Sequence, residues 1–139
     1  MTVLVDPKTQ ARWFKKLREA HQTETTEDYV ELIADLIAAQ GEARLVDIAA
    51  RLGIAHATAN KVLLRLRKEG YVDSQPYRSV FLTDKGADLA RSCKTRHEVI
   101  VGFLLKLGVS RKTAETDAEG IEHHVSAETL EIFRRFIGE

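Results

Sequence analysis

Three side chains that can bind a metal lie close together in the stretch Asp117–His124, near the end of the 139-residue sequence. In a helix, Glu119, Glu122 and His123 occupy positions i, i+3 and i+4, so they share one face. Two carboxylates and an imidazole on one face are ligands that a divalent cation accepts. The alternative is a solvated acidic face, which is the usual role of charges clustered on a helix. This octapeptide alone favours the alternative.

Other candidate ligands lie on helices predicted elsewhere in the chain. An apolar stripe predicts a helix from about Thr25 to Gln40, with Thr25 as N-cap and Asp28 three residues on, as in a capping box. Capping alone accounts for Asp28, and an exposed helix charge accounts for Glu31. His97 lies on a mostly apolar face, where a histidine is more often a core residue than a ligand. The residues themselves leave both interpretations open.

Charge is unevenly distributed along the chain. Lys+Arg and Asp+Glu both total 21, so the net charge is zero and indicates no particular partner. Residues 44–78, however, include seven basic and three acidic residues, so the net charge of this segment is 7 − 3 = +4. Residues 113–133 include six acids and no Lys or Arg. A basic segment and a separate acidic segment indicate two tasks.

Cysteine content and hydropathy limit the class of protein. Cys93 is the only cysteine, which excludes a disulfide framework and a cysteine-rich zinc site, and we interpret it as a small core residue. No segment resembles a signal peptide, and no apolar run is long enough to cross a membrane. We therefore expect a soluble cytoplasmic protein with no membrane partner.

The basic segment has the pattern of a helix-turn-helix. One short helix ends at Gly53, and a second runs from about His56 to Lys68. The predicted core residues of this pair are Val46, Ile48, Ala49, Leu52, Val62, Leu63 and Leu66. The outward face is left with small, amide and basic side chains suited to base edges and phosphates, namely Ala57, Thr58, Asn60, Lys61 and Arg65. An ordinary helical hairpin is the alternative, but the +4 charge favours DNA binding.

Two short strands follow, at 71–73 and 80–83, and they make the unit a winged helix with Arg78 at the tip of the wing. Arg78 would contact a phosphate or the minor groove, or would be a plain surface residue. Helices are then predicted from Thr83 to Leu107, after Ser110 and after Ser126. The apolar faces of these helices indicate a helix-packed homodimer.

The predicted fold class is mainly α, with an N-terminal winged helix-turn-helix followed by an all-helical dimerisation domain. The predicted divisions are an N-terminal extension at 1–23, a DNA-binding domain at 24–83 and a metal-binding and dimerisation domain at 84–139. The extension holds either a helix from about Thr9 to Gln22 or a loosely ordered terminus.

With these motifs in this order, the sequence resembles the DtxR/MntR family of metal-dependent bacterial repressors. The resemblance rests on Glu27–Glu31, the winged helix, Arg96–Glu98 and Asp117–His124, and it covers about residues 25 to 135. It implies a manganese-responsive regulator, not an enzyme, with no small organic substrate. Such a homodimer binds palindromic double-stranded operator DNA when Mn²⁺ lies between its domains, and it represses manganese uptake genes.

The resemblance also implies a binuclear Mn²⁺ centre with six ligands in each subunit. The ligands of one ion would be Asp28, His97, Glu119 and Glu122. Those of the other would be Glu31 and His123, with Glu119 and Glu122 bridging. Oxygen and imidazole ligands without a thiolate suit Mn²⁺, although Zn²⁺, Co²⁺, Cd²⁺ or Fe²⁺ would also bind. His124 points elsewhere on its helix, so we interpret it as a structural residue.

Two other functions fit parts of the pattern. A metal-independent winged-helix regulator would leave the acidic cluster merely solvated. A di-metal hydrolase would use the same carboxylates, but the sequence offers no separate base or oxyanion loop, and a basic winged helix would then be unexplained.

Overall fold

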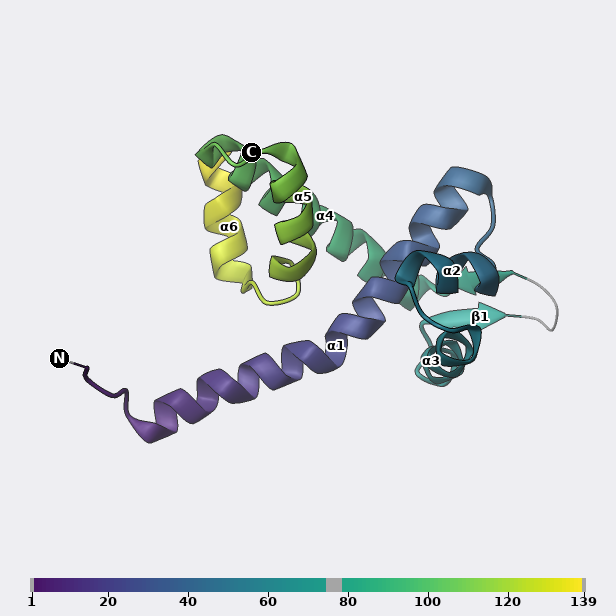
Figure 1. Cartoon of the computed structure of the whole chain (residues 1–139), viewed down its shortest axis with the longest axis horizontal. Helices are drawn as coiled ribbons and strands as arrows, with labels where there is room; N and C mark the ends of the chain where they lie inside the picture. Colours follow the sequence, from purple (N-terminus) through teal and green to yellow (C-terminus); the bar gives the residue numbers. More distant parts are fainter. Residues whose placement is uncertain (1, 75–78, 139) are drawn as a thin grey trace. The chain divides into compact units, whose positions relative to one another are not determined.

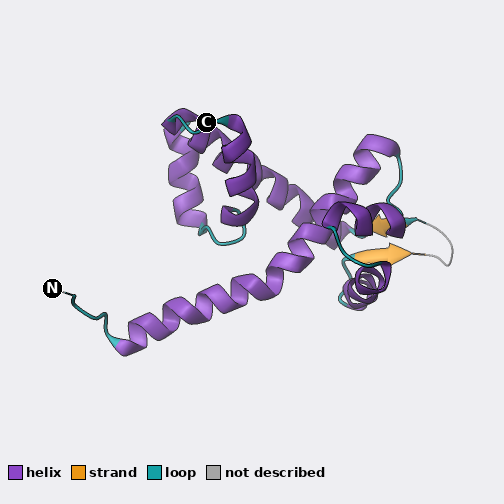
Figure 2. Cartoon of the chain, viewed as in Figure 1, coloured by secondary structure: helices purple, strands orange, loops and turns teal. Residues whose placement is uncertain are grey.

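The structure is a computed structural model that describes residues 2–74 and 79–138. Its elements, in chain order, are α1 (Pro7–Gln40), α2 (Leu45–Leu52), α3 (His56–Lys68), β1 (Val72–Ser74), β2 (Val80–Leu82), α4 (Asp84–Leu107), α5 (Arg111–Ile121) and α6 (Ala127–Phe136). Helices dominate the described residues, alongside one small hairpin (Figure 2). The prediction of a mainly α chain is confirmed.

The chain forms two compact units (Figure 1). One is the Thr26–Glu98 unit. The other, called the terminal unit below, combines the residues before Thr26 with those after Glu98. Both α1 and α4 contribute residues to each unit.

Helix α1 is longer than expected and has no break near Thr25. It begins after Asp6, whose carboxylate accepts a hydrogen bond from the Thr9 N–H at 3.2 Å, and Pro7 takes the first helical position, which suits its fixed φ. The predicted N-cap at Thr25 is wrong. The surrounding segment contains neither Gly nor Pro, and a threonine within a helix costs less than about 1 kcal/mol, so the helix continues.

The core of the Thr26–Glu98 unit joins α1, α2, α3 and the hairpin. Its buried residues are Tyr29, Ile33, Leu36, Ala43, Ile48, Leu63, Leu66, Val72 and Val80. Leu52 and Val62 pack against this core, but Val46 is 51% exposed, so its predicted place in the core is wrong. Gly53 ends α2 with φ +70°, a left-handed conformation that suits the turn of a helix-turn-helix.

The hairpin is tied to the helices on both sides. Strands β1 and β2 are antiparallel, with Val72 opposite Leu82, and the Val80 N–H donates to the Ala43 carbonyl at 2.7 Å. The Thr83 hydroxyl accepts from the Gly86 N–H at 3.1 Å and so caps α4. A Cβ at Gly86 would collide with the Tyr71 carbonyl oxygen, so this close approach requires glycine.

The terminal unit has its own core, built from α4, α5 and α6. Ile100, Val101, Ala114 and Ala118 are its buried residues. The rings of Phe103 and Phe133 stack at a centroid distance of 3.8 Å and join α4 to α6. The predicted helix starts after Ser110 and Ser126 are confirmed. The Ser110 hydroxyl accepts from the Thr113 N–H at 3.3 Å, and the Ser126 hydroxyl accepts from the Thr129 N–H at 3.2 Å, so both serines cap their helices. Within the described ranges, no helix is both long and apolar enough to span a bilayer.

Candidate functional site

One face of α3 presents the residues predicted to contact DNA. Ala59, Leu63 and Leu66 are buried and fix the rotation of the helix about its axis. The opposite face is exposed and carries the predicted contact residues Ala57, Thr58, Asn60, Lys61 and Arg65. Arg78, predicted for the tip of the wing, lies outside the described residues.

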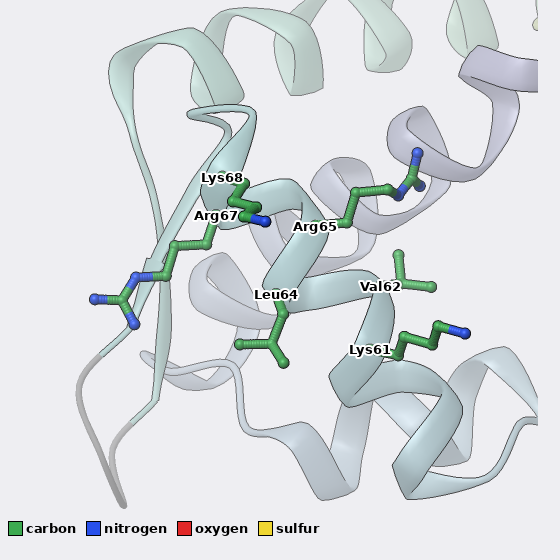
Figure 3. A pocket seen from close by; sticks show the side chains of 6 residues that line it. All are labelled: Lys61, Val62, Leu64, Arg65, Arg67 and Lys68. Carbon is green, nitrogen blue, oxygen red and sulfur yellow. The ribbon is translucent and has the colours of Figure 1, made fainter.

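A basic hollow of 840 Å³ runs along α3, lined by Lys61, Val62, Leu64, Arg65, Arg67 and Lys68. Figure 3 shows Lys61 and Arg65 projecting from one side of the helix and Arg67 from the other. The guanidinium of Arg65 lies 3.7 Å from Glu69, and that of Arg67 lies 3.7 Å from Asp73. These pairs are exposed to solvent and hence weak, so the arginines can exchange them for phosphates.

Three of the six predicted metal ligands belong to the Thr26–Glu98 unit. Asp28 and Glu31 lie one turn apart on α1, and His97 lies near the middle of α4. All three side chains are half-buried. Asp28 and Glu31 alternate with the core residues Tyr29 and Ile33 on α1, and His97 lies one turn after the buried Cys93 on α4, so packing of the helices fixes their backbones.

A buried ion pair joins α1 to α4 beside these residues. Glu27, 6% exposed, accepts a hydrogen bond from the Arg96 guanidinium and another from the Cys93 thiol at 3.2 Å. Burial lowers the pKa of Arg96, but the charge and hydrogen bond of Glu27 outweigh it and leave that pKa raised. Because Glu27 precedes Asp28 and Arg96 precedes His97, this pair positions two ligand-bearing segments.

Sequence reasoning missed this pair. The partners are 69 positions apart, and each resembles an ordinary helix charge when seen locally. The local signals were an acid within the predicted first turn and the presence of both residues in the motifs Glu27–Glu31 and Arg96–Glu98. Cys93 was predicted as a small core residue and is indeed buried, at 1% exposure. Burial, followed by the hydrogen bond to Glu27, raises the pKa of the Cys93 thiol to about 12.

The other three predicted ligands belong to the terminal unit. Helix α5 ends at Ile121, so Glu119 is helical, whereas Glu122 is the C-cap and His123 lies in the following turn. Glu122 keeps helical dihedrals and donates its N–H to the Ala118 carbonyl at 3.0 Å. Its carboxylate lies 3.9 Å from Nε2 of His123.

Burial sets Glu122 and His123 apart from a solvated acidic face. Glu122 is 1% exposed and His123 is 7% exposed, whereas Glu119 is exposed. Burying a charged carboxylate is costly unless a cation or hydrogen bonds compensate for the lost hydration. A buried acid next to a buried imidazole is therefore a better candidate for a metal ligand than for a plain surface charge.

Comparison with known proteins identifies the fold and its two domains. Residues 21–80 match the N-terminal DNA binding domain of the iron dependent repressors, and residues 83–139 match their metal binding and dimerisation domain. The chain belongs to the iron dependent repressor family. As a member of this family it is a metal-responsive transcriptional repressor and not an enzyme, which rules out the hydrolase alternative.

Curated relatives of the chain are transcriptional regulators with the name MntR. The chain is 51% identical over 136 residues to the transcriptional regulator MntR of Escherichia coli O157:H7, covering 98% of this chain and 88% of that protein. It is 38% identical to the HTH-type transcriptional regulator MntR of Lysinibacillus sphaericus, over 78% of each chain.

Solved structures of iron dependent repressors and related proteins share the fold. One, a manganese-dependent transcriptional repressor in complex with manganese, has a TM-score of 0.75 and 28% identity. The match covers 81% of this chain and 52% of the other. The manganese regulator SloR gives a TM-score of 0.71 at 26% identity. This chain thus spans about half the length of these solved relatives.

Proposed function

We propose that this iron dependent repressor responds to manganese. In this proposal a homodimer with bound Mn²⁺ binds a palindromic operator and represses manganese uptake genes. The observation that carries the proposal is the donor set: four carboxylates and two imidazoles, of which Glu122 and His123 are buried. The solved relatives whose titles name manganese support the same ion.

The proposed centre holds two ions in each subunit. The ligands of the first are Asp28, His97, Glu119 and Glu122, and those of the second are Glu31 and His123 with the same two bridging glutamates. This set contains no sulfur ligand, and oxygen-rich sites suit Mn²⁺, which is weak in the Irving–Williams order. The one cysteine fits this view, because the Cys93 thiol is buried, bonded to Glu27 and held protonated by a pKa of about 12.

Charge provides the proposed switch. Asp28, Glu31, Glu119 and Glu122 repel one another when they are all ionised. When bound, divalent cations supply the positive charge that neutralises these carboxylates. The carboxylates then favour one arrangement of the two recognition helices, and because coupling is reciprocal, operator DNA should tighten metal binding. Zn²⁺, Co²⁺, Cd²⁺ or Fe²⁺ would also neutralise the charge, so selectivity would depend on geometry.

The exposed face of α3 is the proposed DNA-reading surface. Ala57, Thr58 and Asn60 are small or amide side chains suited to base edges in the major groove. Lys61 and Arg65 are suited to phosphates, and we propose the same for Arg78 of the wing. These assignments rest on side-chain type and, for the α3 residues, on exposure.

Exposed apolar side chains of the terminal unit support a dimer. Leu107 is 56% exposed, Ile132 57% and Phe136 44%. A second copy of the chain, packed through such residues, would bury them, in agreement with the dimerisation domain that the family match assigns. A two-fold symmetric dimer meets two half-sites, which is why we expect a palindromic operator.

Lys61→Ala is expected to weaken operator binding without changing sequence preference. A lysine that neutralises one phosphate contributes one released counterion, so the slope of log K against log salt should fall by about 1. Binding titrations at several salt concentrations measure this slope. Lys94→Ala, which removes an exposed lysine from α4, is the matched control and should leave the slope unchanged. An unchanged slope in Lys61→Ala would remove Lys61 from the interface.

Titration of the protein onto a candidate palindromic promoter tests the whole proposal. At fixed salt, Mn²⁺ is expected to strengthen binding about 5–150-fold, the range typical of allosteric coupling, and a chelator should reverse it. Parallel titrations with Fe²⁺ and Zn²⁺ measure selectivity. Equal affinity with Mn²⁺ and with chelator would contradict the proposal and favour a regulator that does not respond to this metal.

A further inference from the structure

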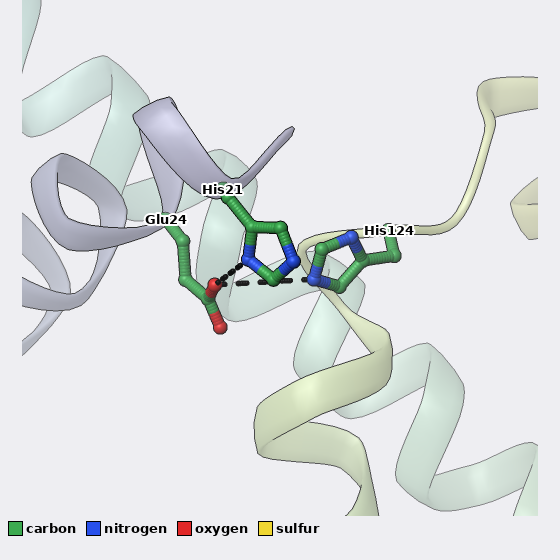
Figure 4. Close-up of side chains that lie close together, drawn as sticks. All are labelled: His21, Glu24 and His124. Carbon is green, nitrogen blue, oxygen red and sulfur yellow. Dashed lines mark hydrogen bonds and ion pairs between the residues drawn. The ribbon is translucent and has the colours of Figure 1, made fainter. Parts of the chain in front are cut away.

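A second cluster of metal-capable side chains lies within the terminal unit and uses none of the six proposed manganese ligands. His21 and Glu24 extend from α1, and His124 extends from the turn between α5 and α6 (Figure 4). Nδ1 of His21 lies 3.2 Å from Oε2 of Glu24, and Nε2 of His124 lies 3.9 Å from the same oxygen. The two imidazole rings meet edge to face at a centroid distance of 5.0 Å.

The spacing of these donor atoms fits a small tetrahedral cation. One donor atom from each residue lies within 4.8 Å of the others. Bonds of about 2.0–2.1 Å at tetrahedral angles place neighbouring ligand atoms about 3.4 Å apart. The separations of 3.2 and 3.9 Å lie on either side of this value, so small side-chain rotations would complete the site.

Ordinary side-chain contacts, without a bound ion, account for only part of this cluster. His21 and Glu24 form an i, i+3 pair on one helix, a common surface contact that contributes little to stability. His124 belongs to a segment distant in sequence, and nevertheless its imidazole approaches the same carboxylate oxygen. Two imidazoles and one carboxylate, brought together from two segments, are a ligand set that zinc proteins use.

We propose that His21, Glu24 and His124 bind a late first-row divalent cation, with Zn²⁺ as the expected ion. Imidazole ligands favour Zn²⁺ over Mn²⁺, so this site and the proposed manganese centre would prefer different metals. Three protein ligands leave the fourth position of a tetrahedral site to water, and the His21 side chain is 67% exposed. A pocket of 140 Å³ bordered by Leu17, Ala20 and His124 adjoins the site.

The bound cation would connect the N-terminal part of α1 to the turn between α5 and α6. That part of α1 carries Trp13, Phe14 and Leu17, which are 55%, 54% and 45% exposed, so few apolar contacts hold it in place. A metal–ligand bond at residues 21–24 would hold this part of α1 in place. The site therefore gives residues before Thr25 a structural task that goes beyond metal-dependent repression.

Co²⁺ titration of the metal-free full-length protein tests the site. Tetrahedral Co²⁺ absorbs visible light far more strongly than octahedral Co²⁺, so the spectrum reports this site separately from an oxygen-rich centre. The wild type is expected to bind one more equivalent than His21→Ala and to show the intense band, which Zn²⁺ should displace. Glu19→Ala removes an exposed carboxylate from the same helix and should behave like the wild type.

A further variant separates this site from the proposed manganese centre. Glu119→Ala removes a proposed manganese ligand and should keep the intense Co²⁺ band, whereas His21→Ala should lose the band and keep Mn²⁺-dependent DNA binding. Equal Co²⁺ binding by the wild type and His21→Ala would overturn the site. Loss of the band in Glu119→Ala or in Glu19→Ala would overturn it as well. If Mn²⁺ had no effect on DNA binding, these spectra would still decide the question.

Discussion

Glu119→Ala is expected to make operator affinity independent of Mn²⁺. Glu119 is one of two glutamates proposed to bridge both ions, so its loss removes a ligand from each. The wild type should bind the operator about 5–150-fold more tightly with Mn²⁺ than with a chelator, and the variant should show a ratio near 1. Fluorescence anisotropy with a labelled operator, at one fixed salt concentration, measures both ratios.

Asp117→Ala provides the matched control for this experiment. Asp117 is an exposed carboxylate on the same helix, two residues earlier, and it is not a proposed ligand. The control should retain the full Mn²⁺ response. A retained response in Glu119→Ala would contradict the proposed ligand set, whereas loss of response in both variants would point to a general effect of charge on α5.

Glu27→Ala is expected to lower the free energy of unfolding by about 3 kcal/mol, because it leaves a largely buried guanidinium without its carboxylate. The side chains of Glu27 and Arg96 are only 7% and 19% exposed. Urea unfolding followed by circular dichroism measures the change. The apparent Mn²⁺ affinity should fall as well, since the pair positions the segments that carry Asp28 and His97.

Asp88→Ala gives the corresponding control on the surface. Asp88 pairs with Arg91 on α4, and both side chains are about 70% exposed. Breaking this pair should cost less than about 1 kcal/mol, because water already solvates both charges. Equal losses in Asp88→Ala and Glu27→Ala would show that burial of the Glu27–Arg96 pair has no special effect on stability.

Local patterns in the sequence determined most of the elements. The spacing of apolar residues predicted α3 and, to within two residues, α2 and α4, because helical periodicity and glycine or serine end signals act over a few residues. The helix-turn-helix and the outward face of α3 followed from the same periodicity, and the wing followed from two short strand-like runs after it. The family was recognisable because four short motifs occur in a fixed order, and the matching domains confirm it.

Contacts between residues distant in sequence were decided only by the tertiary structure, because local patterns carry no information about them. Whether α1 breaks near Thr25 depends on differences below about 1 kcal/mol in propensity, which packing overrides. The pairing of Glu27 with Arg96 joins positions 69 residues apart, and neither residue signals its partner. The sequence suggested only a structural role for His124, and its position beside His21 and Glu24 is a result of folding. The sequence determines the chemistry of each side chain, but burial and chain topology determine which distant side chains come into contact.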